Sequence, residues 1–86
     1  MTSGGMIGLD VGKRWLDAAA GSTGIPQRFA NDASGHQALL AWAQDHQPRL
    51  VVLEASGGYE RGIVAVLDAA GVAVSLRNPT QIRRFA

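Results

Sequence analysis

The feature that most constrains the fold is the short apolar run Leu50-Val51-Val52-Leu53, which ends at Glu54. The run comes shortly after a segment with helical periodicity that ends at Pro48. A continuous apolar run of this length after a helix is typical of a strand buried on both faces in a parallel sheet. Because crossover connections are right-handed, the run should lie beside an earlier strand. The sequence therefore predicts an α/β domain.

The earlier strand is a segment in which apolar residues alternate with glycine and aspartate, Met6-Ile7-Gly8-Leu9-Asp10-Val11-Gly12. The alternation gives one apolar face and one face that carries a single carboxylate, Asp10, between two glycines. A carboxylate within a strand is unfavourable unless it has water, a partner or a cation. Asp10 is therefore either a solvated residue of an edge strand or a contact for a metal ion or a phosphate.

Two short strands and a helix should lie between these segments. Residues 15–20 and 25–30 are each bounded by turn signals and indicate an antiparallel meander with the first strand. Pro26 should delay the start of the third strand or confine it to a sheet edge. The helix should begin with Asp32 as its N-cap and place Trp42 in the core.

A second helix and a fifth strand should follow Glu54. The helical spacing of apolar residues from Tyr59 to Ala70 predicts an amphipathic helix that stops at Gly71, and residues 72–77 alternate as a strand. Asn78-Pro79-Thr80-Gln81 is typical of a helix start. The loop Ser56-Gly57-Gly58 could cradle a phosphate with backbone N–H groups or could be a plain strand-to-helix turn.

This order of elements predicts a ribonuclease-H-like α/β fold: a three-stranded antiparallel meander, then parallel strands joined by crossover helices. The expected sheet order is third, second, first, fourth, fifth, which sets Asp10 and Glu54 side by side at the carboxyl ends of adjacent strands. Two unpaired carboxylates at that distance repel, and a divalent cation between them removes the conflict. Oxygen-only ligands of this kind suit magnesium or manganese.

The other acidic and histidine side chains have plainer interpretations. Asp17, in the second strand, is interpreted as structural or solvated. His36 and His46 are interpreted as surface or helix-end residues, because neither has other metal-binding side chains at ligand spacing.

Composition limits the remaining classes. A chain of 86 residues, 47% hydrophobic and 17% charged, should form one small globular domain. It contains no cysteine, which excludes a disulfide framework and a thiolate metal site. With no apolar run of about 18 residues, we expect a soluble, cytoplasmic protein without membrane association. The net charge of +1 neither requires nor excludes a nucleic-acid partner.

Three stretches together resemble the N-terminal domain of the DEDD transposases, insertion-sequence enzymes related to the Piv-type DNA invertases. They are Gly8-Leu9-Asp10-Val11-Gly12-Lys13, Leu53-Glu54-Ala55-Ser56-Gly57-Gly58-Tyr59-Glu60 and Asn78-Pro79-Thr80-Gln81-Ile82-Arg83-Arg84-Phe85-Ala86. The resemblance implies that residues 1–86 are the N-terminal part of a RuvC-like catalytic domain. Its D-E-D-D tetrad holds divalent metal, with Asp10 as the first acid and Glu54 as the second. Gly12 and Gly62 depart from the family, which often has Ser and Pro there.

The resemblance also implies an activity, metal-dependent phosphoryl transfer on DNA that leads to DNA cleavage, strand exchange and transposition. Two metal ions about 3.5–4 Å apart would orient the attacking and leaving oxygens, with Asp10 as the more central ligand. The implied partners are DNA and, in some members, a guide RNA encoded by the element. Candidate phosphate contacts are Lys13, Arg14, Arg77, Arg83 and Arg84.

The end of the chain suggests a fragment, because the last helix stops at Ala86 after barely two turns. The resemblance places the second acidic pair beyond residue 86, together with a C-terminal domain that supplies a serine for attachment to DNA. We therefore expect residues 1–86 to bind magnesium or manganese weakly or not at all and to be inactive alone. Apolar surface around Ile82 and Phe85 would favour a homodimer.

Three alternatives remain at this point. A RuvC-like Holliday-junction nuclease of the YqgF type also resembles residues 8–13, but Ser56–Glu60 and Asn78-Pro79 argue against it. A sugar kinase or actin-like ATPase would need a longer chain and an adenosine motif. A non-catalytic assembly module is the third.

Overall fold

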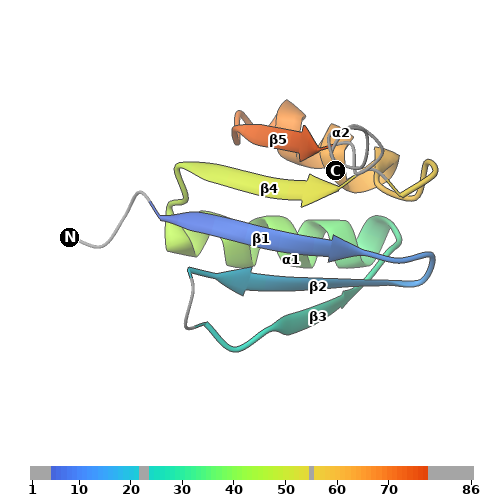
Figure 1. Cartoon of the computed structure of the whole chain (residues 1–86), viewed down its shortest axis with the longest axis horizontal. Coiled ribbons are helices and arrows are strands. Elements are labelled where there is room, and N and C mark those ends of the chain that lie inside the picture. The colour runs from blue at the N-terminus through green and yellow to red at the C-terminus, as the bar shows by residue number, and fades with distance from the viewer. Residues whose placement is uncertain (1–4, 22–23, 55, 78–86) are drawn as a thin grey trace, which may run out of the picture.

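The computed structural model describes residues 5–21, 24–54 and 56–77. They form one five-stranded sheet with two helices on one face (Figure 1). The strands are β1 (Met6–Val11), β2 (Trp15–Ala20), β3 (Gln27–Ala30), β4 (Leu50–Glu54) and β5 (Val74–Arg77), and the helices are α1 (Ala33–His46) and α2 (Arg61–Ala69). The sheet order is β3-β2-β1-β4-β5, as predicted, with β1 antiparallel to β2 and parallel to β4.

Part of the predicted chain lies outside the described residues. This part includes the helix expected from Asn78, the candidate phosphate contacts Arg83 and Arg84, and the apolar pair Ile82 and Phe85. In the described part of the chain, neither helix is long and apolar enough to cross a membrane.

The core lies between the sheet and the two helices. Alternate residues of the central strands and one stripe of each helix are almost fully buried: Ile7, Leu9, Leu16, Ala18, Leu39, Ala43, Val51, Leu53, Ile63 and Leu67. Burial of each large aliphatic side chain contributes roughly 1.5–3 kcal/mol relative to exposure. The period of two in the strands and the helical spacing in α1 and α2 therefore position the sheet on the helices.

The second face of β4 is more open than its sequence predicted. Val51 and Leu53 are buried, but Val52 is only half-buried and Glu54 is exposed. The reason is that α1 and α2 both lie on the same face of the sheet (Figure 1). The opposite face, which carries Asp10, is open in the described residues, and we call it the open face.

Local signals position the start and end of α1 as predicted. The Asp32 carboxylate accepts a hydrogen bond from the Gly35 backbone N–H at 2.8 Å, which satisfies a free donor of the first turn. Gln47 adopts a left-handed conformation, with φ 47°, after the last residue of the helix. Pro48 then prevents the helix from continuing. Trp42, predicted to lie in the core, is only half-buried and packs against the core from its edge.

The start of α2 differs from the prediction. The helix begins at Arg61 rather than at Tyr59, whose side chain is 48% exposed instead of lying in the core. Gly57 and Gly58 both have positive φ, 77° and 110°, so the turn after β4 extends past Tyr59.

Candidate functional site

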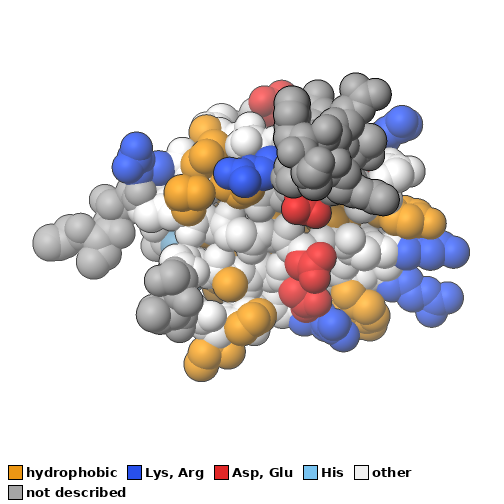
Figure 2. Space-filling model, viewed as in Figure 1, with side chains coloured by type: hydrophobic (Ala, Val, Ile, Leu, Met, Phe, Trp, Pro, Cys, Tyr) orange, Lys and Arg blue, Asp and Glu red, His pale blue; other side chains and the backbone are white. Residues whose placement is uncertain are grey.

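A row of five charged residues crosses the open face of the sheet, one from each strand. Register pairs Asp17 with Arg28, Asp10 with Asp17, and Glu54 with Arg77. Leu9 of β1 pairs with Leu53 of the parallel strand β4. Asp10 and Glu54 are the next residues on these two strands, so they connect the two halves of the row. We call Arg28, Asp17, Asp10, Glu54 and Arg77 the charged row. Figure 2 shows acidic side chains gathered near the middle of this face.

Asp10 and Glu54, the two acids that the sequence singled out, lie at the centre of this row. They lie at the carboxyl ends of β1 and β4, which are adjacent and parallel. Both side chains are exposed, and both line a shallow hollow of about 660 Å³ that Gly8 and Arg77 also border. Gly8 leaves this hollow open because it has no side chain.

Asp17 is held by Arg28, a contact that the sequence did not reveal. The Arg28 guanidinium donates from Nε to Oδ1 at 2.9 Å and from Nη2 to Oδ2 at 3.2 Å. These hydrogen bonds lower the pKa of Asp17 and raise that of Arg28. The structural interpretation of Asp17 is therefore confirmed. Asp10 nevertheless lies between two other acids, Asp17 on β2 and Glu54 on β4. Arg28 offsets the negative charge of Asp17 only.

The pair Asp10 and Glu54 fits a hard divalent cation. The one ion pair among the described residues joins Asp17 and Arg28, so neither central acid has a cationic partner within that part of the chain. Carboxylate oxygens in an open hollow suit magnesium or manganese, which keep water and phosphate ligands. In the ranges that the structure describes, no three His, Cys, Asp or Glu residues gather closely enough to enclose a metal ion.

Asn31 connects the segments that follow the two acids. Its Nδ2 donates to the Gly12 carbonyl oxygen at 2.9 Å, just after β1, and to the Tyr59 carbonyl oxygen at 3.0 Å, between β4 and α2. Because Nδ2 is the donor in both bonds, Oδ1 is the acceptor for His36 Nε2 at 2.6 Å. Asn31 thus holds together the two loops beside the hollow.

His36 is buried, although the residues around it in the sequence predict a position on the surface or at a helix end. It lies in α1 with only 9% of its surface exposed. Gly62 of α2 packs directly against the imidazole, and a Cβ at that position would come within 2.5 Å of His36 Cε1. The missing side chain at Gly62 therefore makes room for the Asn31–His36 contact.

The loop after β4 is stabilised by a carboxylate of its own. Glu60 Oε1 accepts hydrogen bonds from the Ser56 backbone N–H, the Ser56 hydroxyl and the Gly58 backbone N–H, at 2.9–3.1 Å. The Ser56 N–H is the largest cause of a pKa of about 2 for Glu60. Two of the backbone N–H groups that a phosphate cradle would need are thus occupied by Glu60, which favours the interpretation of this loop as a plain turn.

Acid should weaken this loop in a predictable pH range. Folding lowers the pKa of Glu60 from 4.5 to about 2, so its stabilising effect is complete above pH 4.5 and is lost as the pH falls toward 2. We expect Glu60→Gln to lower the melting temperature at pH 7 and to lose that difference near pH 2. Thermal melts across this range check the prediction. Asp68→Asn, on the exposed side of α2, is the control. A decrease in melting temperature of the same size and pH dependence in Asp68→Asn would contradict the assignment.

Three of the candidate phosphate contacts lie in the described residues, and only one of these borders the hollow. Lys13 and Arg14 lie exposed in the turn between β1 and β2, while Arg77 borders the hollow beside Glu54. The structure thus sets one of these cations next to the acids and two at the end of the hairpin.

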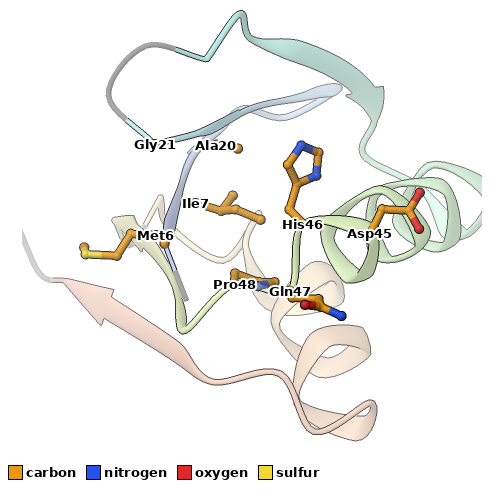
Figure 3. Close-up of a pocket in the computed structure, with 9 residues that line it drawn as sticks. Met6, Ile7, Ala20, Gly21, Asp45, His46, Gln47 and Pro48 are labelled. Atoms are coloured by element: carbon orange, nitrogen blue, oxygen red, sulfur yellow. The ribbon is translucent and has the colours of Figure 1, made fainter. Parts of the chain in front are cut away.

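A second cavity, of about 320 Å³, lies at the opposite end of β1 (Figure 3). It is bordered by the start of β1, the end of β2 and the end of α1 with His46. His46 Nδ1 donates to the Trp42 carbonyl oxygen at 2.8 Å, which confirms it as a helix-end residue. This cavity is separate from Asp10 and Glu54.

The sheet order, with β1 antiparallel to β2 and parallel to β4, is that of a RuvC-like, ribonuclease-H-like fold. The structure of Thermus thermophilus RuvC matches with a TM-score of 0.61 and 18% sequence identity, over 92% of this chain and 64% of that chain. The chain thus spans less than two thirds of that RuvC, and at this identity the likeness concerns the fold alone. A family model described as transposase, DEDD_Tnp_IS110, matches residues 7–86. The chain belongs to this transposase family. A search of curated protein sequences gives no match.

Proposed function

We propose that this chain is part of a DNA transposase catalytic domain in which Asp10 and Glu54 together hold a divalent cation against a DNA phosphate. The observation that carries the proposal is the placement of two exposed carboxylates at the carboxyl ends of adjacent parallel strands, where both line one hollow. Membership of the transposase family supplies DNA as the substrate class. The cation that suits such ligands is magnesium or manganese.

The residues in and beside the hollow have different proposed roles in phosphoryl transfer. Asp10 and Glu54 bind the cation, and Asp10 is the more central because it lies between Asp17 and Glu54. A bound divalent cation would stabilise negative charge on the phosphoryl oxygens. Arg77 borders the same hollow and supplies a positive charge for a neighbouring phosphate. Asn31 keeps the two flanking loops in position through their carbonyl groups.

The family resemblance adds further parts to the proposal. Two more aspartates would complete the metal site, a serine would attach covalently to DNA, and a guide RNA would select the sites for recombination. A second copy of the protein would assist strand exchange. A Holliday-junction nuclease of the same fold is the less favoured candidate, because the family that matches is a transposase family.

The transposase that contains this domain should cleave DNA only with magnesium or manganese, and the chain of 86 residues should not cleave DNA by itself. Two carboxylates hold magnesium loosely, because the ion needs further oxygen ligands to replace its water. Incubation of labelled DNA with either protein, with and without EDTA, checks both statements. Cleavage by the transposase in EDTA would overturn the proposed function. Metal-dependent cleavage by the chain alone would contradict the ligand-count argument.

A further inference from the structure

We propose that Trp15, held in place by Arg28, is a stacking platform for an unpaired base of single-stranded DNA whose phosphate lies at the Asp10–Glu54 hollow. The inference rests on the proposed function in that it takes DNA as the ligand. It adds the form of the DNA and the residue that holds the base.

Trp15 is a large aromatic side chain that the fold leaves 48% exposed. It begins β2 and lies on the open face, because Leu16 beside it is buried on the helix side. Asp17, two residues along the same strand, shares this face and borders the acidic hollow. Two residues of a strand span about 7 Å, a distance that one nucleotide of an extended DNA strand can bridge.

Arg28 orders the indole of Trp15. Its guanidinium carbon lies 5.4 Å from the centroid of the Trp15 ring, within the range of a cation–π contact. The same guanidinium makes both hydrogen bonds to Asp17. The three side chains therefore form one array in which Asp17 holds Arg28 and Arg28 holds Trp15. An aromatic surface ordered in this way needs little further ordering when a base stacks on it.

The surroundings of Trp15 are complementary to a nucleic-acid strand. Across the hairpin its neighbour is Gly12, whose backbone N–H donates to the Trp15 carbonyl oxygen at 2.9 Å and which adds no side chain. Lys13 and Arg14 follow in the turn and are exposed. Figure 2 shows basic side chains at the end of this face, beyond the acidic ones. An apolar ring bordered by cations suits a base and its phosphates.

Single-stranded DNA suits this arrangement better than a duplex. In a duplex the faces of the bases are already stacked, whereas every unpaired base offers a face to an aromatic side chain. Removal of one stacking aromatic typically weakens single-strand binding about tenfold or more. Because stacking accepts any base, the platform would position DNA near the acids without reading its sequence.

Intrinsic fluorescence tests the platform directly, because the chain has only two tryptophans. In a Trp42→Phe variant, Trp15 is the sole reporter. We expect oligothymidylate of about ten nucleotides, added in EDTA, to quench its emission, and a duplex of equal length to quench it much less. Anisotropy of labelled oligothymidylate, measured on the otherwise unchanged chain, should show about tenfold weaker binding for Trp15→Leu and near-normal binding for Trp15→Phe.

A matched pair of arginine variants distinguishes the contribution of the Trp15 platform to DNA binding from a general effect of positive charge. Arg28→Gln should weaken binding, whereas Arg49→Gln, an equal charge change just before β4 at the other end of the sheet, should have a much smaller effect. Normal binding by Trp15→Leu, or equal or tighter binding of duplex DNA or of RNA, would overturn the inference. Quenching of Trp15 by the single strand, together with DNA cleavage by the transposase in EDTA, would overturn the proposed function and leave the platform standing.

Discussion

Replacing Asp10 by Asn in a transposase that contains this domain is expected to lower the rate of DNA cleavage by about 10³-fold or more. The change removes a negative oxygen from the position between Asp17 and Glu54. Stabilisation of phosphoryl charge by a bound cation is worth several kcal/mol, and each 1.36 kcal/mol corresponds to a factor of ten in rate. Single-turnover cleavage of end-labelled DNA measures the effect. Glu54→Gln should give a loss of the same kind.

The fold should survive this substitution. Asp10 is exposed and lies directly opposite another acid, Asp17, so the asparagine removes a like-charge neighbour and should stabilise the domain by up to about 1 kcal/mol. Asp45→Asn is the matched control, since Asp45 is an exposed acid near the end of α1. Cleavage that stays within about tenfold of the unchanged enzyme, or a loss that comes with unfolding, would count against the assigned role.

Gly35→Ala should have the largest effect on stability. Gly35 is buried in the first turn of α1, and a Cβ there would run into the carbonyl oxygen of Ala30, the last residue of β3. Backbone atoms cannot rotate away, so either the helix or the strand must shift. We expect a loss of about 3 kcal/mol or more, out of a total on the order of 4–13 kcal/mol for a domain of this length.

Urea denaturation of the two proteins measures this difference. Gly8→Ala is the matched control, because an added Cβ at Gly8 has open space around it and should change the free energy of unfolding by no more than about 0.5 kcal/mol. If Gly35→Ala unfolds at the same urea concentration as the unchanged chain, the close packing of α1 on β3 is wrong.

Much of the fold could be predicted because its signals are local. The alternation around Leu9, the apolar run ending at Leu53 and the cap at Asp32 each define an element, and the right-handed crossover then gives the sheet order. The predictions that were wrong concern the exposure of individual side chains. Val52 is only half-buried because both helices lie on the same face, and Tyr59 is exposed because two glycines lengthen the turn.

The site was predictable only where topology alone brings residues together. The placement of Asp10 and Glu54 on adjacent strands follows from the sheet order, and their roles remain a proposal. Asp17 could have been placed opposite Asp10, since both are equally far from the two-residue turn at Lys13-Arg14. Its pairing with Arg28 depends on the register of β2 and β3, which no sequence pattern specified.

The hydrogen bonds around the site had no signal in the sequence. Asn31 and Glu60 bind backbone groups of loops whose shape arises only in the folded chain. The burial of His36 likewise depends on the packing of α1 against α2 at Gly62. Such contacts are set by tertiary structure, so residue spacing along the chain does not indicate them.

Titration of the isotope-labelled chain with Mn²⁺, followed by NMR, examines whether Asp10 and Glu54 bind one divalent cation together, as proposed. Paramagnetic broadening identifies the nearby amides even when binding is weak. If the two acids share the ion, amide signals of β1 and β4 beside the hollow, at Leu9, Asp10 and Leu53, broaden first. This broadening then disappears in both Asp10→Asn and Glu54→Gln. Broadening centred on Asp45 or Asp68 instead, or unchanged broadening in the two variants, would contradict the claim.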